Sequence, residues 1–298
     1  MDFDVIIIGG SYAGLSAALT LGRSTRNVLV IDAGKPCNRQ TPHSHNFLTH
    51  DGDRPAEISV AAKAEVLKYP TVKFISAKAN SAKQLEDGFL VGVEDGQYFT
   101  SRKILLVTGL KDTLPDIKGL AACWAISAIH CPYCHGYEVK NEKIALLMNG
   151  EHAFDMAKTL HLWNKDLTIL TNGKSQLTAE QAEKLKAKSI TVLEEEIFEL
   201  EHQNGHLEDV VFKNGEKIAF KAIYVKPEIE QHVNFNEQLE FELTELKTIK
   251  VNEQQQTTAK GVYAAGDCAT LFRSLSIITA AGTMAAVMIN KELISEDF

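Results

Sequence analysis

A glycine-rich turn between two short apolar runs near the N-terminus constrains the fold of this chain most strongly. The run Val5–Ile8 is long enough for a buried strand and too short for a buried helix. The turn GGSYAG (residues 9–14) follows, and an apolar-periodic helix is predicted from Leu15 to about Leu21. A second predicted strand, Val28–Ile31, ends on Asp32. This order and spacing indicate a dinucleotide-binding βαβ unit, in which a strand, a glycine turn, a helix and a second strand are followed by an acidic residue.

Each part of this turn has a physical reason. Gly9 permits the tight turn, and Gly14 lets the helix pack closely on the strand. The helix N-terminus presents free N–H groups to a pyrophosphate, and Asp32 can accept a hydrogen bond from a ribose hydroxyl. Ser11 stands where a middle glycine is usual, and its side chain is small enough to be tolerated.

Composition excludes several classes of function. The chain has 298 residues, of which 45% are hydrophobic and 23% charged, which is typical of a globular protein with a substantial core. A formal net charge of −8 argues against a nucleic-acid partner, because phosphates require a basic surface. No uninterrupted apolar stretch is long enough to span a bilayer, and the acidic N-terminus does not resemble a signal peptide. We therefore expect a cytoplasmic protein with no membrane partner.

The stretch IHCPYCHGY (residues 129–137) contains two cysteines, Cys131 and Cys134, flanked by His130 and His135. It is compatible with half of a zinc site, with haem attachment, or with a redox-active disulfide. Zinc usually requires a second ligand pair, and the chain has no later CxxC or HxxxH. Haem attachment would require export. The sequence therefore favours a redox pair and no metal.

Two further motifs lie far from the first. Near the C-terminus, KGVYAAGDC (residues 260–268) ends a predicted strand in Gly266-Asp267, and a long helix rich in small residues follows. The run ILLVTG (residues 104–109) ends a strand in Thr108-Gly109. These motifs resemble the second FAD fingerprint and the "ATG" strand of flavoproteins with two dinucleotide folds. With CxxC between them, the chain resembles the low-molecular-weight thioredoxin reductase family over essentially its whole length.

This resemblance implies an α/β fold with two Rossmann-type, three-layer domains and a discontinuous FAD domain. Residues 1–110 and 228–298 are expected to bind FAD. Residues 111–227 are expected to form an inserted domain similar to the NAD(P)H domain of the family, and to carry the CxxC. The resemblance also implies a homodimer and a partner that is a thioredoxin-like protein or a small-molecule dithiol or disulfide.

The resemblance also assigns site residues. The expected FAD-binding residues are Gly9, Gly10, Ser11, Ala13, Gly14, Asp32, Arg39, Gln40, Asn46, Thr108, Gly109, Gly266 and Asp267. Cys134 is expected to face the flavin and Cys131 to exchange with the partner's sulfur.

The acid–base residue is expected to be His135, because it occupies the position of the family's catalytic aspartate and titrates near neutrality. The sequence CHG also resembles a subgroup, the FAD dithiol oxidases that use oxygen. His130 has either a catalytic or a structural role. Cys37, Cys123 and Cys268 are expected to be small buried side chains.

The inserted domain repeats the βαβ order, with strands predicted at Lys143–Leu147 and Leu167–Leu170 and a helix at Ala153–Trp163. Its fingerprint differs from the family's GGGNTA, since residues 148–153 read MNGEHA. Where the family uses His-Arg-Arg to hold the 2′-phosphate of NADPH, residues 171–173 read TNG, and the family's GHxPN is also absent. NADPH binding is therefore doubtful.

The predicted function is FAD-dependent dithiol–disulfide oxidoreduction of the thioredoxin reductase type, through Cys131 and Cys134. Two enzymatic alternatives are a dithiol oxidase that passes electrons to oxygen and a reductase supplied by a donor such as ferredoxin. The non-enzymatic alternative is a flavin-bound redox sensor, which would cycle once without consuming substrate.

Overall fold

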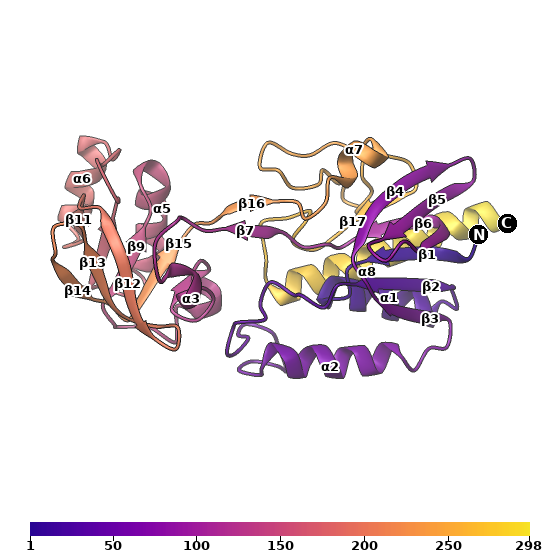
Figure 1. The fold of residues 1–298 in the computed structure, drawn as a ribbon, viewed down its shortest axis with the longest axis horizontal. Helices are drawn as coiled ribbons and strands as arrows, with labels where there is room; N and C mark the ends of the chain where they lie inside the picture. Colours follow the sequence, from indigo (N-terminus) through magenta and orange to yellow (C-terminus); the bar gives the residue numbers. More distant parts are fainter. The chain divides into compact units, whose positions relative to one another are not determined.

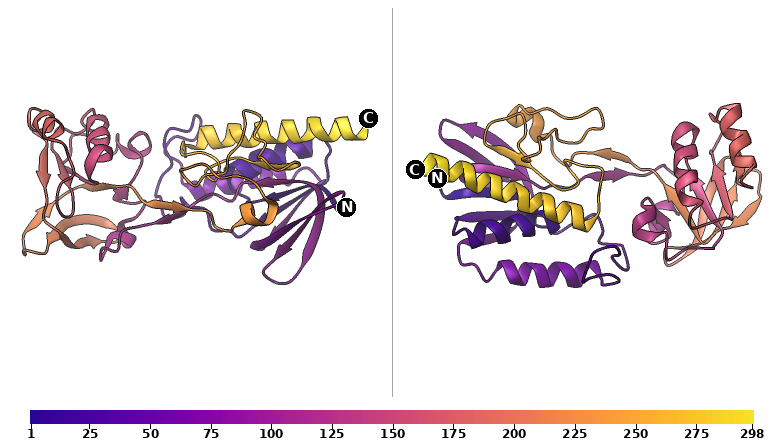
Figure 2. Two further views of the ribbon diagram at one scale, coloured as in Figure 1. Left: turned by 90° about the horizontal axis from the view of Figure 1, so that it is seen from above. Right: turned by 180° about the vertical axis from the view of Figure 1, so that it is seen from behind.

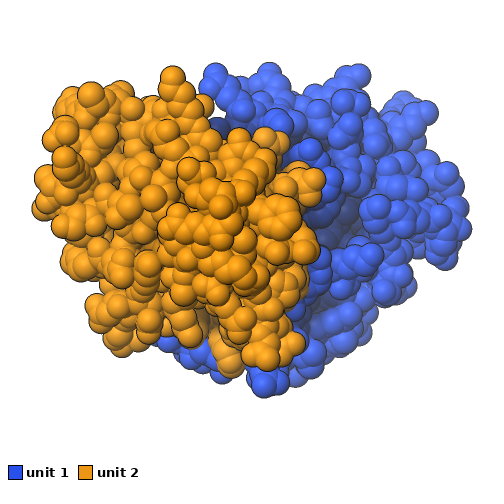
Figure 3. Space-filling model, turned by 60° about the vertical axis from the view of Figure 1, so that its left-hand side comes forward, with its two compact units in different colours: residues 1–39, 46–111, 229–298 blue, residues 40–45, 112–228 orange.

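The computed structural model describes residues 1–298, which form two compact units. Unit 1 comprises residues 1–39, 46–111 and 229–298, and unit 2 comprises residues 40–45 and 112–228 (Figure 3). Both units are α/β with a central parallel sheet, so the predicted fold class is confirmed. The division departs from the predicted domain boundaries at residues 40–45. This segment packs with unit 2, where His45 contacts Glu138.

The main sheet of unit 1 has the strand order β3-β2-β1-β6-β5-β4, and β17 also pairs with β6 (Figure 1). The parallel strands are β1 (Phe3–Ile8), β2 (Val28–Asp32), β3 (Val72–Ser76), β6 (Tyr98–Leu106) and β17 (Val262–Ala264). The antiparallel strands β4 (Ala79–Leu85) and β5 (Gly88–Val93) extend this sheet, which the sequence patterns did not predict. The predicted unit β1-α1-β2 is present, with β1 and β2 in parallel register.

Alternating side chains of the strands in unit 1 fill two cores on opposite faces of the sheet. Val5 and Ile7 of β1 face α1 (Tyr12–Arg23), α2 (Pro55–Val66) and α8 (Leu275–Asp297). Ile6 and Ile8 face the opposite core, which includes side chains of β4, β5 and α7 (Phe235–Leu239). A strand buried on both faces is continuously apolar, which explains the run at the N-terminus.

Helices α1 and α8 lie side by side on one face of the sheet, as both views in Figure 2 show. Glycine makes this contact possible. A Cβ atom on Gly282 of α8 would lie 2.1 Å from the carbonyl oxygen of Ala13 in α1. The helix backbones therefore touch where α1 begins, and the glycine turn of residues 9–14 leads directly into this contact.

Helix α8 is also long and apolar enough to cross a membrane by length and composition, which the sequence reasoning did not anticipate. Core helices of globular proteins meet the same criterion. In this structure one side of α8 packs into the core of unit 1 through Ile278, Gly282, Ala285, Ala286, Ile289 and Leu293.

The sheet of unit 2 is parallel, with the order β11-β10-β9-β15-β8; strands β9, β11 and β15 are labelled in Figure 1. Its strands are β8 (Ala128–Ile129), β9 (Ile144–Leu147), β10 (Leu167–Leu170), β11 (Thr191–Leu193) and β15 (Ala222–Val225). The predicted repeat is confirmed as β9, α5 (Gly150–Leu160) and β10, with β9 and β10 in parallel register. Two short strands, β7 (Lys111–Thr113) and β16 (Glu228–Glu230), pair where the chain passes between the units.

Unit 2 also has three layers. Helices α5 and α6 (Ala179–Lys186) cover one face of the sheet. Helix α3 (Leu120–Cys123) and a meander of β12 (Ile197–Gln203), β13 (His206–Phe212) and β14 (Lys217–Ala219) cover the other. Turns at Asn204-Gly205 and at Asn214-Gly215 join these strands. Asn204 and Gly205 both have positive φ, at 52° and 83°, as a two-residue hairpin turn requires.

The contact between α1 and α8 yields a stability prediction. Gly282→Ala improves helix propensity by about 1 kcal/mol, but its methyl group meets the Ala13 backbone, which cannot rotate away. Overpacking costs about 1–3 kcal/mol, and a rigid backbone contact belongs at the upper end of this range. We therefore expect a net loss of about 1–2 kcal/mol, measured as a lower melting temperature. Ala280→Ser, at an exposed position of the same helix, should melt like the wild type.

Candidate dinucleotide cleft and redox disulfide

A cavity of about 540 Å³ lies in unit 1, beside the carboxyl ends of β1, β2 and β6. Ligands of open α/β sheets bind at this edge, because the loops that follow the strands converge there. Nine of the predicted FAD-binding residues line the cavity: Gly9, Gly10, Ser11, Ala13, Asp32, Thr108, Gly109, Gly266 and Asp267.

The glycines of the turn are required by close backbone contacts. Gly9 has φ of +117°, and a Cβ atom there would lie 2.2 Å from the carbonyl oxygen of Val107. A Cβ atom on Gly14 would lie 2.0 Å from the carbonyl oxygen of Gly9. Gly14 does not line the cavity, so its position supports the packing role predicted for it. The N-terminus of α1 is thereby held against β1 at the edge of the cavity.

Two carboxylates line the cavity. Asp32, at the end of β2, accepts a hydrogen bond from the backbone N–H of Gly10 at 3.2 Å. Asp267 is buried, and its Oδ2 accepts a hydrogen bond from Nε of Arg273 at 3.0 Å. The Asp267–Arg273 pair therefore places a fixed acceptor and a fixed cation on one wall.

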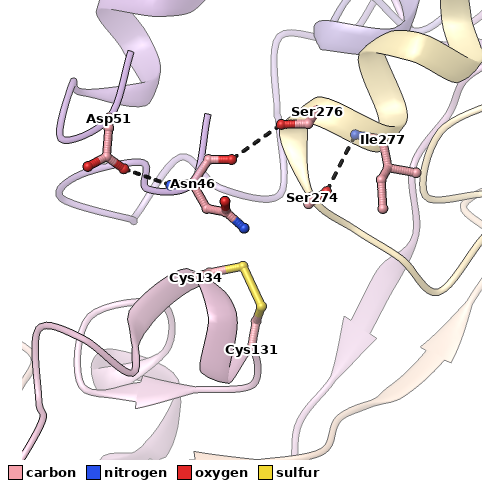
Figure 4. The surroundings of a disulfide bond; sticks show 7 residues. All are labelled: Asn46, Asp51, Cys131, Cys134, Ser274, Ser276 and Ile277. Atoms are coloured by element: carbon pink, nitrogen blue, oxygen red, sulfur yellow. Dashed lines mark hydrogen bonds between the residues drawn. A yellow bond between two sulfur atoms is a disulfide. The ribbon is translucent and has the colours of Figure 1, made fainter. Parts of the chain in front are cut away.

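Three of the predicted FAD-binding residues lie elsewhere. Arg39 and Gln40 are exposed and do not line the cavity, and Gln40 is part of unit 2. Asn46 is held in a left-handed conformation, with φ of 60°. Its backbone N–H donates to Asp51 and its carbonyl oxygen accepts from Ser276 (Figure 4).

The sequence reasoning also missed several polar side chains of the cavity. Lys35 and Asn38 lie in the loop after β2, Lys78 lies between β3 and β4, and Arg273 precedes α8. These positions lie outside the glycine motifs, so motif reading alone gave no signal for them. The three positive charges among them suit a ligand that carries phosphate.

The CxxC pair lies in unit 2 at helix α4 (Pro132–His135), where Cys131 is the N-cap residue. Cys131 and Cys134 form a disulfide with their Cα atoms 5.3 Å apart (Figure 4). No group of three or more His, Cys, Asp or Glu side chains in the structure is placed to hold a metal ion.

His135 is the last residue of α4 and is partly buried. Burial lowers the pKa of its imidazole, and the nearby charge of Glu138 partly offsets this by raising it. The next residue, Gly136, is buried, and a Cβ atom there would lie 3.2 Å from the Trp163 ring. Tyr133 meets the same ring edge-on, so the helix that carries the disulfide is held by aromatic packing. His130 stacks on Trp124, with ring centroids 5.6 Å apart.

The remaining three cysteines differ from one another. Cys123 and Cys268 are buried as expected, and burial raises the pKa of both thiols, that of Cys268 to about 11. The expectation was wrong for Cys37, which is exposed, lines the cavity and lies 3.7 Å from Oδ2 of Asp267. The loop after β2 ends at the cavity rather than in a core, which accounts for the difference.

The N-terminus of α5 has a different structure from that of α1. The side-chain oxygen of Asn149 accepts hydrogen bonds from the backbone N–H groups of Gly150 and Gln176, both at 2.8 Å. Its amide nitrogen donates to the carbonyl oxygen of Lys174 at 3.0 Å. The Asn149 side chain thus ties the start of α5 to residues 174–176.

The arrangement of two dinucleotide-type units and a CxxC disulfide agrees with comparison to known proteins. The family model described as pyridine nucleotide-disulphide oxidoreductase matches residues 3–285. The chain belongs to this family. It is therefore an oxidoreductase that acts on sulfur groups, as predicted.

Individual relatives are similar over their full length. A thioredoxin reductase of Aspergillus oryzae, aclD, is 29% identical over 98% of this chain and 96% of its own length. A putative thioredoxin reductase from Bacillus anthracis has a solved structure with a TM-score of 0.95 and 32% identity, covering 99% of this chain and 100% of that one. An oxidoreductase from Agrobacterium tumefaciens gives a TM-score of 0.93 and 37% identity, over 99% of both chains. The predicted resemblance to thioredoxin reductases is confirmed.

Membership of this disulphide oxidoreductase family implies FAD, and the cavity of unit 1 fits a dinucleotide. The start of α1 lines the cavity through Ser11, Tyr12 and Ala13, and Ser11 makes no side-chain cap to the helix. The N–H groups of a helix N-terminus with no side-chain cap suit a pyrophosphate, and Asp32 and Asp267 provide hydroxyl acceptors. When bound, the flavin supplies an acceptor or donor for two electrons.

This fit predicts that Asp267→Asn weakens FAD retention. The amide keeps the shape of the side chain but removes the charge of the buried acceptor. Loss of a charged hydrogen bond of about 1.5–3 kcal/mol corresponds to roughly 10- to 150-fold weaker binding. The ratio of flavin to protein absorbance after gel filtration measures this loss. Asp53→Asn, in an exposed loop outside the cavity, is the control, and equal FAD content in both variants would contradict the assignment.

Proposed function

We propose that this protein is an FAD-dependent dithiol–disulfide oxidoreductase that exchanges electrons with a thiol or disulfide partner through Cys131 and Cys134. The observation that carries the proposal is the disulfide of α4 with the partly buried imidazole of His135 directly after it. A disulfide beside an acid–base group has the components needed for thiol–disulfide exchange.

In the oxidative direction, a partner thiol gives its proton to His135, and the resulting thiolate attacks the Sγ of Cys131. The bond between Cys131 and Cys134 breaks, and Cys134 leaves as a thiolate. The second partner thiol gives its proton to the Cys134 thiolate and attacks the partner sulfur of the mixed disulfide. The bond to Cys131 breaks, Cys131 leaves as a thiolate, and the partner leaves as a disulfide, so that the protein retains two electrons on its cysteines. The reductive direction reverses these steps.

We infer that the nucleotide site of unit 2 is degenerate, because the Asn149 side chain accepts a hydrogen bond from the first backbone N–H of α5, one of the groups that a pyrophosphate would use. Its side-chain oxygen caps Gly150 at the start of α5 and also accepts from Gln176. Met148 precedes it, and Glu151 adds a negative charge in the first turn of the helix. A negative charge there repels a phosphate that the helix N-terminus would otherwise attract.

The loop after β10 lacks the features that hold a 2′-phosphate. The backbone N–H of Ser175 donates to the carboxylate of Glu194 at 3.2 Å, and that of Gly173 donates to the carbonyl oxygen of Glu194 at 2.9 Å. An acidic side chain therefore lies where an NADPH-binding loop presents arginines. Both observations support an electron donor other than a pyridine nucleotide.

A dithiol oxidase that passes electrons to oxygen is the second candidate, and the state of His135 favours it. Burial lowers the pKa of this imidazole below its ordinary value of 6.5, so the ring is mainly neutral at pH 7. A neutral imidazole accepts the proton of an incoming thiol. Neither a ferredoxin donor nor a sensor role has a comparable feature of the structure in its favour.

We further propose a cytoplasmic homodimer whose partner is a thioredoxin-like protein or a small-molecule dithiol. Relatives named thioredoxin reductase support the partner class. Exposed apolar side chains on α8, namely Ile277, Met284, Val287 and Ile294, support association between two copies.

The order of the two thiols can be tested by spectroscopy. Cys131→Ser should leave Cys134 as a thiolate beside the flavin and produce a long-wavelength charge-transfer band. Cys134→Ser should not produce this band, because Cys131 is expected to face the partner instead. Absorbance spectra of both purified variants decide this, and a band in Cys134→Ser alone would reverse the order.

The electron source can be tested by anaerobic stopped-flow measurement. Loss of two or three charge-assisted contacts, each worth about 1.5–3 kcal/mol, weakens nucleotide binding by a few orders of magnitude. Millimolar NADPH or NADH should therefore reduce the flavin very slowly, whereas dithiothreitol reduces it readily in the same preparation. Rapid, saturable reduction at micromolar NADPH would show that the nucleotide site is functional.

A further inference from the structure

Two consecutive residues after α5, Trp163 and Asn164, contact the segment that carries the redox disulfide. The backbone N–H groups of both donate to the carbonyl oxygen of Leu160 at 3.0 Å, so the chain turns where α5 ends. Leu160 is fully buried in the core beneath α5, which anchors this turn. We call Trp163 and Asn164 the α5 corner. The corner and the disulfide both belong to unit 2.

The corner holds the loop that follows α4. Asn164 is fully buried, and its Nδ2 donates to the carbonyl oxygens of Val139 and Glu142, at 2.5 and 2.9 Å. In the same loop, the backbone N–H of Asn141 donates to the carbonyl oxygen of Trp163 at 3.1 Å. Three hydrogen bonds therefore tie this loop to the end of α5.

The ring of Trp163 packs against α4 itself. Tyr133 meets this ring edge-on, with the ring centroids 5.7 Å apart. A Cβ atom on Gly136 would lie 3.2 Å from the ring, so the glycine lets the end of α4 approach it closely. Cys134 lies between these two positions in the chain. Helix α4 has 4 residues, whereas isolated helices shorter than about 12 residues are marginal, so its position depends on such packing.

The two cysteines are anchored by different parts of unit 2. Cys131 follows β8, in which Ile129 pairs with Tyr224 of β15 in the central sheet. Cys134 lies in the segment that the α5 corner holds. While the disulfide is closed, the covalent bond keeps the two sulfurs together. Once it is reduced, the sheet holds Cys131 and the corner holds Cys134.

We propose that the α5 corner keeps Cys134 close to Cys131 when the pair is reduced, and thereby keeps the reduction potential of the pair low. The inference rests on the proposed function, in which this pair exchanges electrons. Reduction adds two electrons and two protons to the disulfide and gives two thiols. Thiols that stay close have a high effective concentration toward one another, which favours the closed disulfide. Trp163 and Asn164 act through the position of Cys134, as positioning residues.

Equilibration with mixtures of reduced and oxidised dithiothreitol measures this potential. The full-length, FAD-loaded protein is equilibrated without oxygen and alkylated with iodoacetamide, and mass spectrometry of the peptide that contains both cysteines gives the reduced fraction. Asn164→Ala and Trp163→Ala should each shift the equilibrium about tenfold toward the dithiol, a rise of about 30 mV for a two-electron couple. Trp163→Phe keeps an aromatic ring against Tyr133 and should stay near the wild-type potential.

Thr178→Ala is the control for a general loss of stability. Thr178 caps α6, where its side chain accepts from the backbone N–H of Gln181 at 3.2 Å. This variant should melt at a lower temperature and keep the wild-type potential. Because Trp163 is partly exposed, Trp163→Ala should fold even if Asn164→Ala does not, and its potential then decides alone. A wild-type or lower potential in the corner variants that fold would overturn the proposal.

A second measurement separates this proposal from the proposed function. Dithiothreitol should reduce the flavin through the cysteine pair, so the double variant with Cys131→Ser and Cys134→Ser should lose most of this rate. An unchanged rate in the double variant would contradict the proposed function, because electrons would then bypass the pair. A wild-type potential in Asn164→Ala and Trp163→Ala contradicts only the role of the α5 corner.

Discussion

Direct contact between backbones, without intervening side chains, is the constraint on which unit 1 depends. Helix α1 is pressed between β1 and α8, with Gly14 against Gly9 on one side and Gly282 against Ala13 on the other. Any Cβ at these glycines would force the layers apart. Because the contacts are concentrated at the first turn of α1, they fix the position of its N–H groups relative to Asp32 and Asp267, and hence the shape of the cavity.

The two units share a βαβ plan, β1-α1-β2 in unit 1 and β9-α5-β10 in unit 2, and differ in how the helix of that plan starts. In unit 1, Ser11 leaves the start of α1 without a side-chain cap, and the N–H groups stay available at the cavity. In unit 2, Asn149 caps α5 and holds a neighbouring loop as well. One residue at the helix start thus distinguishes the two turns. In unit 1 the backbone N–H groups at the start of α1 are free of a side-chain cap and can bind a ligand, whereas in unit 2 a side chain of the protein itself caps α5. This difference supports assigning the flavin chemistry to unit 1 and the thiol chemistry to unit 2.

Sequence reasoning predicted the parts of this fold that are set by local pattern. The apolar run before Gly9 and the helix that follows the glycine turn depend on near neighbours, and both were predicted from residue type alone. Features set by distant packing were missed. The antiparallel strands β4 and β5 carry no strong local signal, and the fit of Gly282 against Ala13 becomes apparent only when residues far apart in sequence meet. Arg273 and Cys37 reach the cavity for the same reason. The assignment of residues 40–45 to unit 2 also depends on long-range contacts such as that between His45 and Glu138.

The Asn149 cap has a consequence for attempts to give this protein a nucleotide donor. A cap that belongs to the chain competes with any free ligand at a fixed effective concentration, which for short connections is in the millimolar range or above. The cap therefore multiplies the apparent dissociation constant of a dinucleotide by a constant factor, and only a correspondingly higher ligand concentration displaces it. Introducing arginines after β10 alone would leave the start of α5 occupied. An engineered nucleotide site would first have to remove the Asn149 side chain, and the residues 174–176 that it holds would then need a new anchor.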